Sequence, residues 1–443
     1  RNKGALFGRT RLRLALLRFF ARLTAPLIPR SSFLVSDPSS LLLIRPDHMG
    51  DLLFTTPALR ALRAALPQAR ITALVGPWGR DVVERNPHLD EVLTCPFPWF
   101  SRQPRTSILE PYRLLWAEAR KLRAQEFDAA VILRFDHWWG ALLAYLARIP
   151  VRVGYDVAEC RPFLTQAVPY TPGRHEVEQN LALIEAVTGQ QPEASSQRPG
   201  LEFEPTAEER AFAVHFLAQH GVVASAHLRT QQRPALSTGP VSGCEVASAH
   251  PRTRQRPALS TGPVSACEGE SELLVGLHPG AGAPVKLWRP EAFAQVADAL
   301  AREHGARILI TGSAAEVPLA RAIAQRMTAS PIIAAGQTSL GQLAALLARC
   351  RLVIGVDSGP MHLAVAQDVP TVHLYGPVDH RTFGPWGDPA RHRVVLSDLS
   401  CIPCNRLDYA PHELADHPCV RSITVPQVLE AANALLKNRP PVV

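Results

Sequence analysis

The sequence predicts an α/β protein with two doubly wound parallel sheets. Short apolar runs alternate with helical patterns, which is typical of parallel strands joined by crossover helices. The alternation occurs twice, once before residue 190 and once after residue 272, in a chain of 443 residues. That length suits two or three domains.

The first half begins with the apolar run LLLIR at 41–45, which predicts a short buried strand. The turn-like stretch PDHMGD follows, and a helical pattern then runs from 55 to 67. The later runs predict strands at 71–76, 91–95 and 128–135, and helices at 81–87 and 113–125.

The second half repeats this arrangement, starting with a strand and loop at 273–280. Gly305 follows a helical pattern at 290–304 and is expected to end that helix, because Gly readily adopts the left-handed conformation of a helix C-cap. Further strands are predicted at 306–312, 331–336, 351–357 and 370–376, and further helices at 317–327, 340–350 and 359–367.

We place an N-terminal domain at 38–205, a C-terminal domain at 273–424 and a final helix at 425–437. Between the domains, residues 223–245 and 246–268 match at 20 of 23 positions. Two copies are too few for a solenoid core, and their polar, Pro-rich composition cannot offset the entropy of ordering. We therefore predict a disordered tandem-repeat insert at 221–272.

The basic charge is concentrated in one arm. Residues 1–30 hold eight Lys or Arg and no acid, and the rest of the chain is neutral. Between residues 9 and 23, arginines gather on one side of a helical pattern and Leu and Phe on the other, although Arg13 interrupts the apolar side. This indicates an amphipathic helix on an anionic membrane surface, and a packed or frayed leader is the alternative.

Composition argues against several classes of protein. No apolar run approaches the ~20 residues of a membrane-spanning helix. A basic arm, rather than a basic folded face, argues against nucleic-acid binding. The eight cysteines are scattered, so we expect a reducing compartment. The sequence starts at Arg1 rather than Met, and we expect it to be clipped at its front.

Three loops after predicted strands carry candidate site residues. In the first, Gly50 permits a tight turn and Asp51 opens a helix. A carboxylate there can cap the helix or face a cleft as a general base, and position alone favours the cap.

The other two loops belong to the second half. The loop 278–288 contains two glycines and Lys286, which together suit a phosphate, although it matches neither the dinucleotide fingerprint nor the P-loop. In 355–362, Ser358 and Gly359 stand at a helix N-terminus, which favours negative charge. An ordinary βα loop and an N-capping turn are the respective alternatives.

Four stretches together resemble glycosyltransferase family 9, the bacterial heptosyltransferases of lipopolysaccharide core synthesis. They are LLLIRPDHMGDLLFTTPALRALR, GLHPGAGAPVKLWRPEAFAQVADAL, ILITGSAAE and VIGVDSGPMHLAVAQDVPTVHLYGPVD. The resemblance spans about 41–430 without the insert. It implies a GT-B fold, in which an acceptor-side Rossmann-like domain at 38–205 faces a nucleotide-sugar-binding Rossmann-like domain at 273–424 across a cleft.

The resemblance also implies roles for individual residues. Asp51 stands where the family has its proposed catalytic base, which outweighs the cap interpretation. Arg45 matches a basic position near the acceptor. The donor would be bound by a phosphate-binding Lys, an acid that contacts the nucleoside and a diphosphate loop, matched here by Lys286, by Glu316 and by Asp357, Ser358, Gly359 and His362.

The C-terminal cysteines depart from the family. Cys401, Cys404 and Cys419 resemble a Cys-rich segment of the second heptosyltransferase type, which has a further Cys between them. With His412 or His417 they could bind zinc, and a reduced remnant loop is the alternative. We assign no metal ligand and no cofactor, and the missing Cys leaves the heptosyltransferase subtype open.

The implied reaction is an inverting transfer of heptose from ADP-heptose to a lipid-linked core saccharide. No Asp-x-Asp motif occurs, which fits metal independence. We expect a cytoplasmic monomer, peripheral on the inner face of the cytoplasmic membrane. A nucleotide-sugar epimerase of the same architecture and a non-catalytic nucleotide-sugar-binding protein are the rival interpretations.

Overall fold

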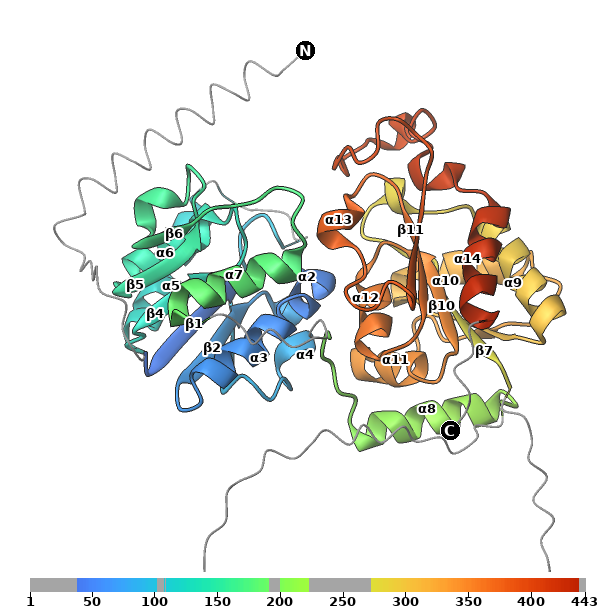
Figure 1. Ribbon diagram of the computed structural model, residues 1–443, viewed down its shortest axis with the longest axis horizontal. Helices are drawn as coiled ribbons and strands as arrows, with labels where there is room; N and C mark the ends of the chain where they lie inside the picture. The colour runs from blue at the N-terminus through green and yellow to red at the C-terminus, as the bar shows by residue number, and fades with distance from the viewer. Residues whose placement is uncertain (1–37, 102–106, 108, 191–199, 223–271, 438–443) are drawn as a thin grey trace, which may run out of the picture.

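The computed structural model describes residues 38–101, 107, 109–190, 200–222 and 272–437. The basic arm at 1–30 and both copies of the repeat lie outside these residues. The described chain forms two six-stranded parallel sheets, each covered by helices on both faces (Figure 1). This confirms the predicted α/β fold class.

The first sheet has the strand order β3-β2-β1-β4-β5-β6. Its strands are β1 (Ser40–Arg45), β2 (Arg70–Val75), β3 (Glu91–Thr94), β4 (Ala129–Ile132), β5 (Val151–Tyr155) and β6 (Gln166–Val168). Its α-helices are α2 (Met49–Leu53), α3 (Thr56–Ala65), α4 (Arg80–Val83), α5 (Glu110–Arg123), α6 (Trp138–Leu146) and α7 (Glu176–Thr188).

The second sheet repeats the same winding, with the order β12-β11-β10-β7-β8-β9. Its strands are β7 (Leu274–His278), β8 (Arg307–Ile310), β9 (Ile332–Ile333), β10 (Leu352–Val356), β11 (Thr371–Tyr375) and β12 (His392–Leu396). Its α-helices are α9 (Pro290–His304), α10 (Val317–Ala324), α11 (Leu340–Leu347), α12 (Gly359–Ala366), α13 (His380–Phe383) and α14 (Val425–Lys437).

Strands β1 and β7 are buried along their whole length. Parallel strands covered on both faces carry continuous apolar runs, and this is why the sequence revealed them. Gly305 adopts φ 64° at the C-cap of α9, as expected for a helix that ends in a left-handed residue.

The connection between the halves is more ordered than the sequence indicates. Helix α8 (Ala207–Gln219) follows the first half in the chain but packs on α11 of the second half (Figure 1). Gly221 and Val222, which we assigned to the insert, belong to this packed segment, because Val222 is buried in the core and its N–H bonds to Leu217 O. Arg85 binds Glu209 of α8 through two hydrogen bonds of 2.7 and 3.0 Å.

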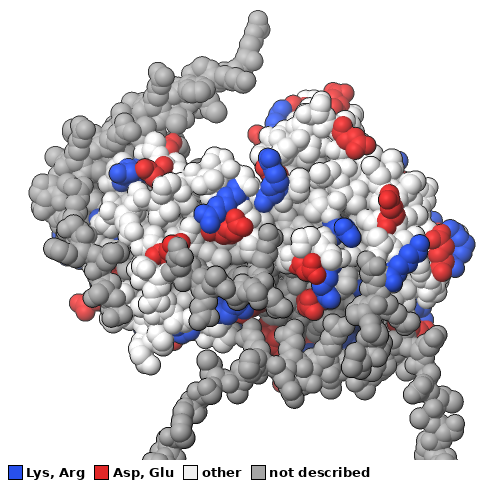
Figure 2. All heavy atoms as spheres, viewed as in Figure 1, with Lys and Arg blue, Asp and Glu red and all other residues white. Residues whose placement is uncertain are grey.

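In each sheet the strand order reverses beside the first strand, between β1 and β4 and between β7 and β10. Open α/β sheets bind ligands at the carboxyl ends of the strands at such a point. The visible face is hollowed between the halves and carries basic and acidic side chains on both sides (Figure 2). Within the described residues, no helix is long and apolar enough to cross a membrane.

Candidate active site between the two sheets

Helices α2 and α12 bring the two reversal points into direct contact. A Cβ atom added at Gly359 would lie 2.9 Å from Met49 Cβ, and one added at Gly50 would lie 3.1 Å from His362 Cδ2. The Phe54 ring lies edge-on to the His362 ring, with centroids 4.6 Å apart. The absence of a side chain at two glycines therefore sets the distance between the halves beside Asp51.

We expect Gly359→Ala to reduce turnover by roughly 10–100-fold, because displacing reacting groups by about 1 Å costs about that much. Gly50→Ala should reduce it less, since its closest approach, to His362 Cδ2, is longer at 3.1 Å. Steady-state rates of the two variants, with melting temperatures as a folding control, test this. A wild-type rate for Gly359→Ala would show that α2 and α12 do not need this contact during turnover.

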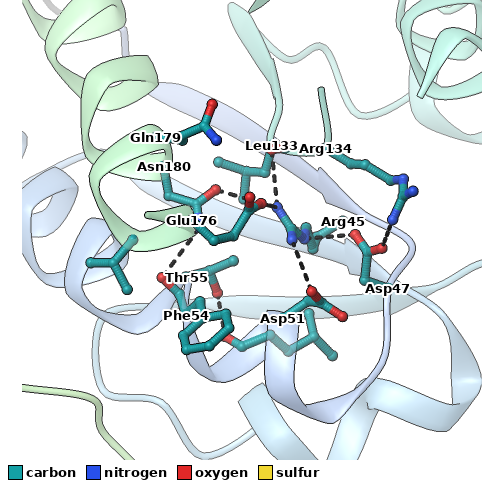
Figure 3. A network of polar contacts seen from close by, with 12 residues as sticks. Arg45, Asp47, Asp51, Phe54, Thr55, Leu133, Arg134, Glu176, Gln179 and Asn180 are labelled. Atoms are coloured by element: carbon teal, nitrogen blue, oxygen red, sulfur yellow. Dashed lines mark hydrogen bonds and ion pairs between the residues drawn. The ribbon is translucent and has the colours of Figure 1, made fainter. Parts of the chain in front are cut away.

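Asp51 lies in the first turn of α2 and points toward a buried network of charges (Figure 3). Its side chain is 31% exposed, and its carboxylate lies 3.7 Å from a terminal nitrogen of Arg45. The N-cap of α2 is His48, and no side chain hydrogen-bonds at that cap. The structure therefore does not support the alternative interpretation of Asp51 as a helix cap.

Arg45 is the centre of this network, at the end of β1. Its guanidinium pairs with Asp47 at 2.7 Å and with Glu176 of α7 at 2.7 Å, and also donates to Leu133 O at 3.0 Å. Asp47 in turn binds Arg134, which follows β4. Arg45 is only 2% exposed and already engaged by three carboxylates, so its surroundings suit the positioning of Asp51. The acceptor role that the resemblance implies for Arg45 stays a prediction.

The network sets the protonation behaviour of Asp51. Burial, followed by repulsion from Asp47, raises the pKa of the Asp51 carboxyl to about 7, although Arg45 acts in the opposite direction. The pKa of Asp47 is lowered, because Arg45 and Arg134 stabilise its charge against the cost of burial. Asp51 is thus a carboxyl that can accept a proton near neutral pH.

Opposite Asp51, the loops after β7 and β10 form a second charged cluster. Lys286 Nζ lies 2.8 Å from Asp357 Oδ2, and His362 Nε2 lies 3.9 Å from Asp357 Oδ1. The pKa of Asp357 lies well below its usual range, since Lys286 outweighs the cost of burial. The structure thus brings together residues from two separate motifs, Lys286 from the loop 278–288 and Asp357 with His362 from 355–362.

Two polar atoms at the start of α12 are buried without a hydrogen-bond partner in the described structure. They are Ser358 Oγ and His362 Nδ1. Ser358 occupies the N-cap position of α12, but its hydroxyl makes no capping bond. Buried polar groups are normally hydrogen-bonded, so these atoms together with the helix N-terminus suit an anionic ligand.

Glu316 lies on the same side of the second sheet. Its Oε2 accepts the Ser313 N–H at 2.6 Å and so closes a capping box at the 3₁₀ turn η5 (Ala314–Glu316). A Cβ atom at Gly280 would lie 1.8 Å from Glu316 Oε1, so the Gly-rich loop requires Gly280 for this close approach. The capping hydrogen bond therefore uses Oε2 of Glu316, while Oε1 lies beside the Gly-rich loop at Gly280.

The C-terminal cysteines do not form a metal centre in the described part of the chain, where no three His, Cys, Asp or Glu side chains are grouped to hold a metal ion. Cys419 is buried, and it packs beside Val285 and the ring of Tyr409. The structure therefore gives no support to the zinc alternative.

Sequence reasoning missed Asp47, Arg134 and Glu176. Asp47 lies only two residues beyond Arg45, so the sequence could have predicted an ion pair between them at the end of β1. Glu176 and Arg134 come from α7 and the loop after β4, and no local pattern indicates that they meet Arg45.

Two parallel sheets of the same doubly wound order, joined beside the carboxyl ends of their first strands, form the GT-B fold. The model of glycosyltransferase family 9 (heptosyltransferase) matches residues 115–411. The chain belongs to this family and is a glycosyltransferase.

Named relatives agree with this assignment. Lipopolysaccharide heptosyltransferase 2 of Salmonella typhimurium is 26% identical over 410 residues, covering 90% of this chain and 99% of that protein. Lipooligosaccharide heptosyltransferase 2 of Campylobacter jejuni is 34% identical over 170 residues, but the match spans only 51% of that protein.

Solved structures share the fold. A family 9 glycosyltransferase from Veillonella parvula has a TM-score of 0.68 and 25% identity, with 92% of this chain and 100% of that chain covered. The E. coli ADP-heptose lps heptosyltransferase II has a TM-score of 0.61 and 23% identity, with 90% and 98% covered.

Proposed function

We propose that the protein transfers heptose from ADP-heptose to a lipopolysaccharide core acceptor, with inversion at the anomeric carbon and without a metal ion. The observation that carries this proposal is the placement of Asp51. A carboxyl with a pKa of about 7 lies on α2, which directly contacts the helix start of the proposed donor site. The family and its named relatives support heptose as the sugar.

In the proposed step, an acceptor hydroxyl oxygen forms a bond to the anomeric carbon of the donor sugar. The bond between that carbon and the phosphate oxygen breaks, and its electron pair leaves with ADP. Asp51 accepts the hydroxyl proton. Attack from the face opposite the nucleotide inverts the configuration.

The second half stabilises the charge on the departing diphosphate. Lys286 supplies a cation, and the start of α12 supplies backbone N–H groups and the free Ser358 hydroxyl. Asp357 carries a negative charge and would repel the diphosphate, so we assign it a positioning role. It holds Lys286 directly, and His362 lies against its other oxygen.

The remaining predicted residues act around this centre. Glu316 binds the nucleoside of the donor through the carboxylate oxygen that the capping bond leaves free. Arg45 holds Asp51 in place and tunes its proton affinity. The enzyme works in the cytoplasm at the inner face of the membrane, where a lipid-linked acceptor is available.

The rate is expected to rise with pH through about 7, because Asp51 must be ionised to accept a proton. Glu176→Gln should move this midpoint to lower pH, since the charge of Glu176 helps to raise the pKa of Asp51. Profiles of kcat/KM against pH measure both effects. Glu178→Gln on the same helix is the matched control, because Glu178 pairs with Arg174 at the surface and not with the network. Coincident profiles for wild type and Glu176→Gln would contradict the assignment.

The direct test of the proposed function is a donor screen followed by mass spectrometry. Nucleotide-diphosphate sugars are incubated with defined core acceptors in the presence of EDTA. The proposal expects an acceptor product that carries one added heptosyl unit from ADP-heptose. Sugar conversion without any acceptor would instead indicate an epimerase, and donor binding without turnover would indicate a binding protein.

A further inference from the structure

Exposed apolar side chains are concentrated in one short part of the chain. Among the described residues the large apolar side chains that are exposed are Trp99, Leu109, Tyr112, Trp116, Val214 and Leu407. Leu109, Tyr112 and Trp116, which are 57%, 49% and 56% exposed, lie at the N-cap and within the first half of α5. Single exposed apolar residues are normal, but a group on one helix requires an explanation.

The exposed side of α5 also carries arginines. At 3.6 residues per turn, six residues of this helix project within an arc of about 100°. They are Leu109, Tyr112, Arg113, Trp116, Arg120 and Arg123, and we call them the α5 face. The opposite side is buried in the core of the first half through Leu115, Ala119 and Leu122.

Among the residues that the structure describes, no acid pairs with the arginines of the α5 face. Glu110 and Glu118 project outside the arc, and Glu118 is buried and already bound to Lys121 at 2.7 Å. Within the part of the chain that the structure describes, the guanidinium groups of Arg113, Arg120 and Arg123 have no ion-pair or hydrogen-bond partner. Several arginines on other helices are paired, for example Arg60 of α3 with Glu202 and Arg210 of α8 with Glu204. The α5 face is thus a positive, aromatic surface. Its arginines have no partner among the described residues.

We propose that the α5 face docks on an anionic membrane surface. Trp and Tyr favour the headgroup level of a bilayer, where the ring is buried and its polar tip remains hydrated. Arg binds lipid phosphates through its planar fork of donors and is attracted by the negative surface potential. This inference deepens the proposed function, because it rests on an acceptor that is embedded in a membrane.

The position of α5 suits this role. Strand β3 is parallel to β1, so both strands have their carboxyl ends on the side of the sheet where the site lies. Helix α5 follows β3 and begins on that side, so Leu109 and Tyr112 lie at the end of the helix nearer the site. Trp139 Nε1 donates to Pro111 O at 3.2 Å and so joins the start of α5 to α6. Residue His137, immediately before α6, interacts electrostatically with Asp47 of the charge network. Docking by α5 would thus hold the acceptor side of the site close to the lipid headgroups.

The test is vesicle partitioning of the full chain, measured by flotation. One variant removes charge from the face (Arg113→Gln, Arg120→Gln and Arg123→Gln together), and a second removes its rings (Tyr112→Ser with Trp116→Ser). Matched controls remove equal charge elsewhere (Arg302→Gln, Arg321→Gln and Arg393→Gln together) or two other exposed apolar groups (Val214→Ser with Leu407→Ser). Wild type, variants and controls all contain the basic arm at 1–30, so its contribution cancels when the partitioning of a variant is divided by that of wild type.

On vesicles of phosphatidylethanolamine with phosphatidylglycerol, we expect the charge variant to partition about 100-fold less than wild type. The ring variant should partition about tenfold less, and the controls should stay near wild type. Turnover on a soluble acceptor should be unchanged in both variants, whereas turnover on an acceptor in vesicles should fall.

Wild-type partitioning of both variants would overturn the inference. A change in oligomeric state with unchanged partitioning would also overturn it, because the face would then bind protein. Loss of turnover on the soluble acceptor would show that the face contacts substrate instead. If the wild-type protein transfers no heptose but the variants still lose vesicle binding, the proposed function fails and the docking surface stands.

Discussion

Asp51→Asn is expected to lower the single-turnover rate by roughly 10²–10⁴-fold, the range for loss of a positioned general base. Asn keeps the shape of the side chain but does not accept the proton. Donor affinity should be unchanged, because the donor cluster around Lys286 and Asp357 belongs to the other half of the molecule. Rapid-quench kinetics with saturating donor, together with calorimetric donor binding, measure the two quantities.

The stability of the same variant provides an independent control. The pKa of Asp51 is raised in the folded protein, so the fold disfavours its charged form at any pH above the ordinary carboxyl value of about 3.9. This cost develops between about pH 4 and pH 7 and is complete above pH 7. Asp51→Asn should therefore unfold at an equal or higher temperature than wild type above pH 7 and at a similar temperature near pH 4. A large rate loss accompanied by a lower melting temperature would point to structural damage instead.

Lys286→Met is expected to affect both donor binding and stability. Loss of charge-assisted hydrogen bonds of about 1.5–3 kcal/mol should raise the donor dissociation constant by roughly 10–100-fold. Stability should also fall by about 3–5 kcal/mol, the usual effect of removing one partner of a buried ion pair, since Asp357 would remain buried without Lys286. The depressed pKa of Asp357 means that this stability difference exists above about pH 4 and disappears as the pH falls through the folded value.

A double variant separates these two effects. Lys286→Met with Asp357→Asn removes both charges of the pair and should recover most of the lost stability. The donor affinity should remain weak, because the cation for the diphosphate is still absent. Calorimetric titration with ADP on the single and double variants decides the matter. Recovery of donor affinity in the double variant would mean that Lys286 serves only to neutralise Asp357.

The sequence revealed elements where one physical rule dominates. Strands β1, β7 and β10 are buried on both faces and appear as continuous apolar runs. The sequence predicts a tight turn at Gly50 and a helix that opens at Asp51, whereas the structure has a short helix, α2, that already includes Met49 and Gly50 and packs on α12 of the second half. Helix α8 did have a local signal in the sequence, because Thr206 is followed three residues later by Glu209, the spacing of a capping box.

The site divides in the same way. Asp51 directly follows Gly50, and Lys286 lies in a loop with two glycines that follows an apolar run, so both motifs are local. The network that sets the pKa of Asp51 is not local, because Glu176 approaches Arg45 only through the packing of α7 on the first sheet. The unusual proton affinity of Asp51 therefore depends on tertiary structure and was beyond prediction from its motif.

The measurement that tests the central claim most directly is the anomeric configuration of the transfer product. The donor is ADP-heptose of defined configuration, the acceptor is a core saccharide, and the reaction contains EDTA. Nuclear magnetic resonance of the purified product should show one new glycosidic linkage of inverted configuration, formed by wild type and almost absent with Asp51→Asn. A product of retained configuration, or an equal yield from the Asn variant, would contradict direct attack by an acceptor hydroxyl that Asp51 deprotonates.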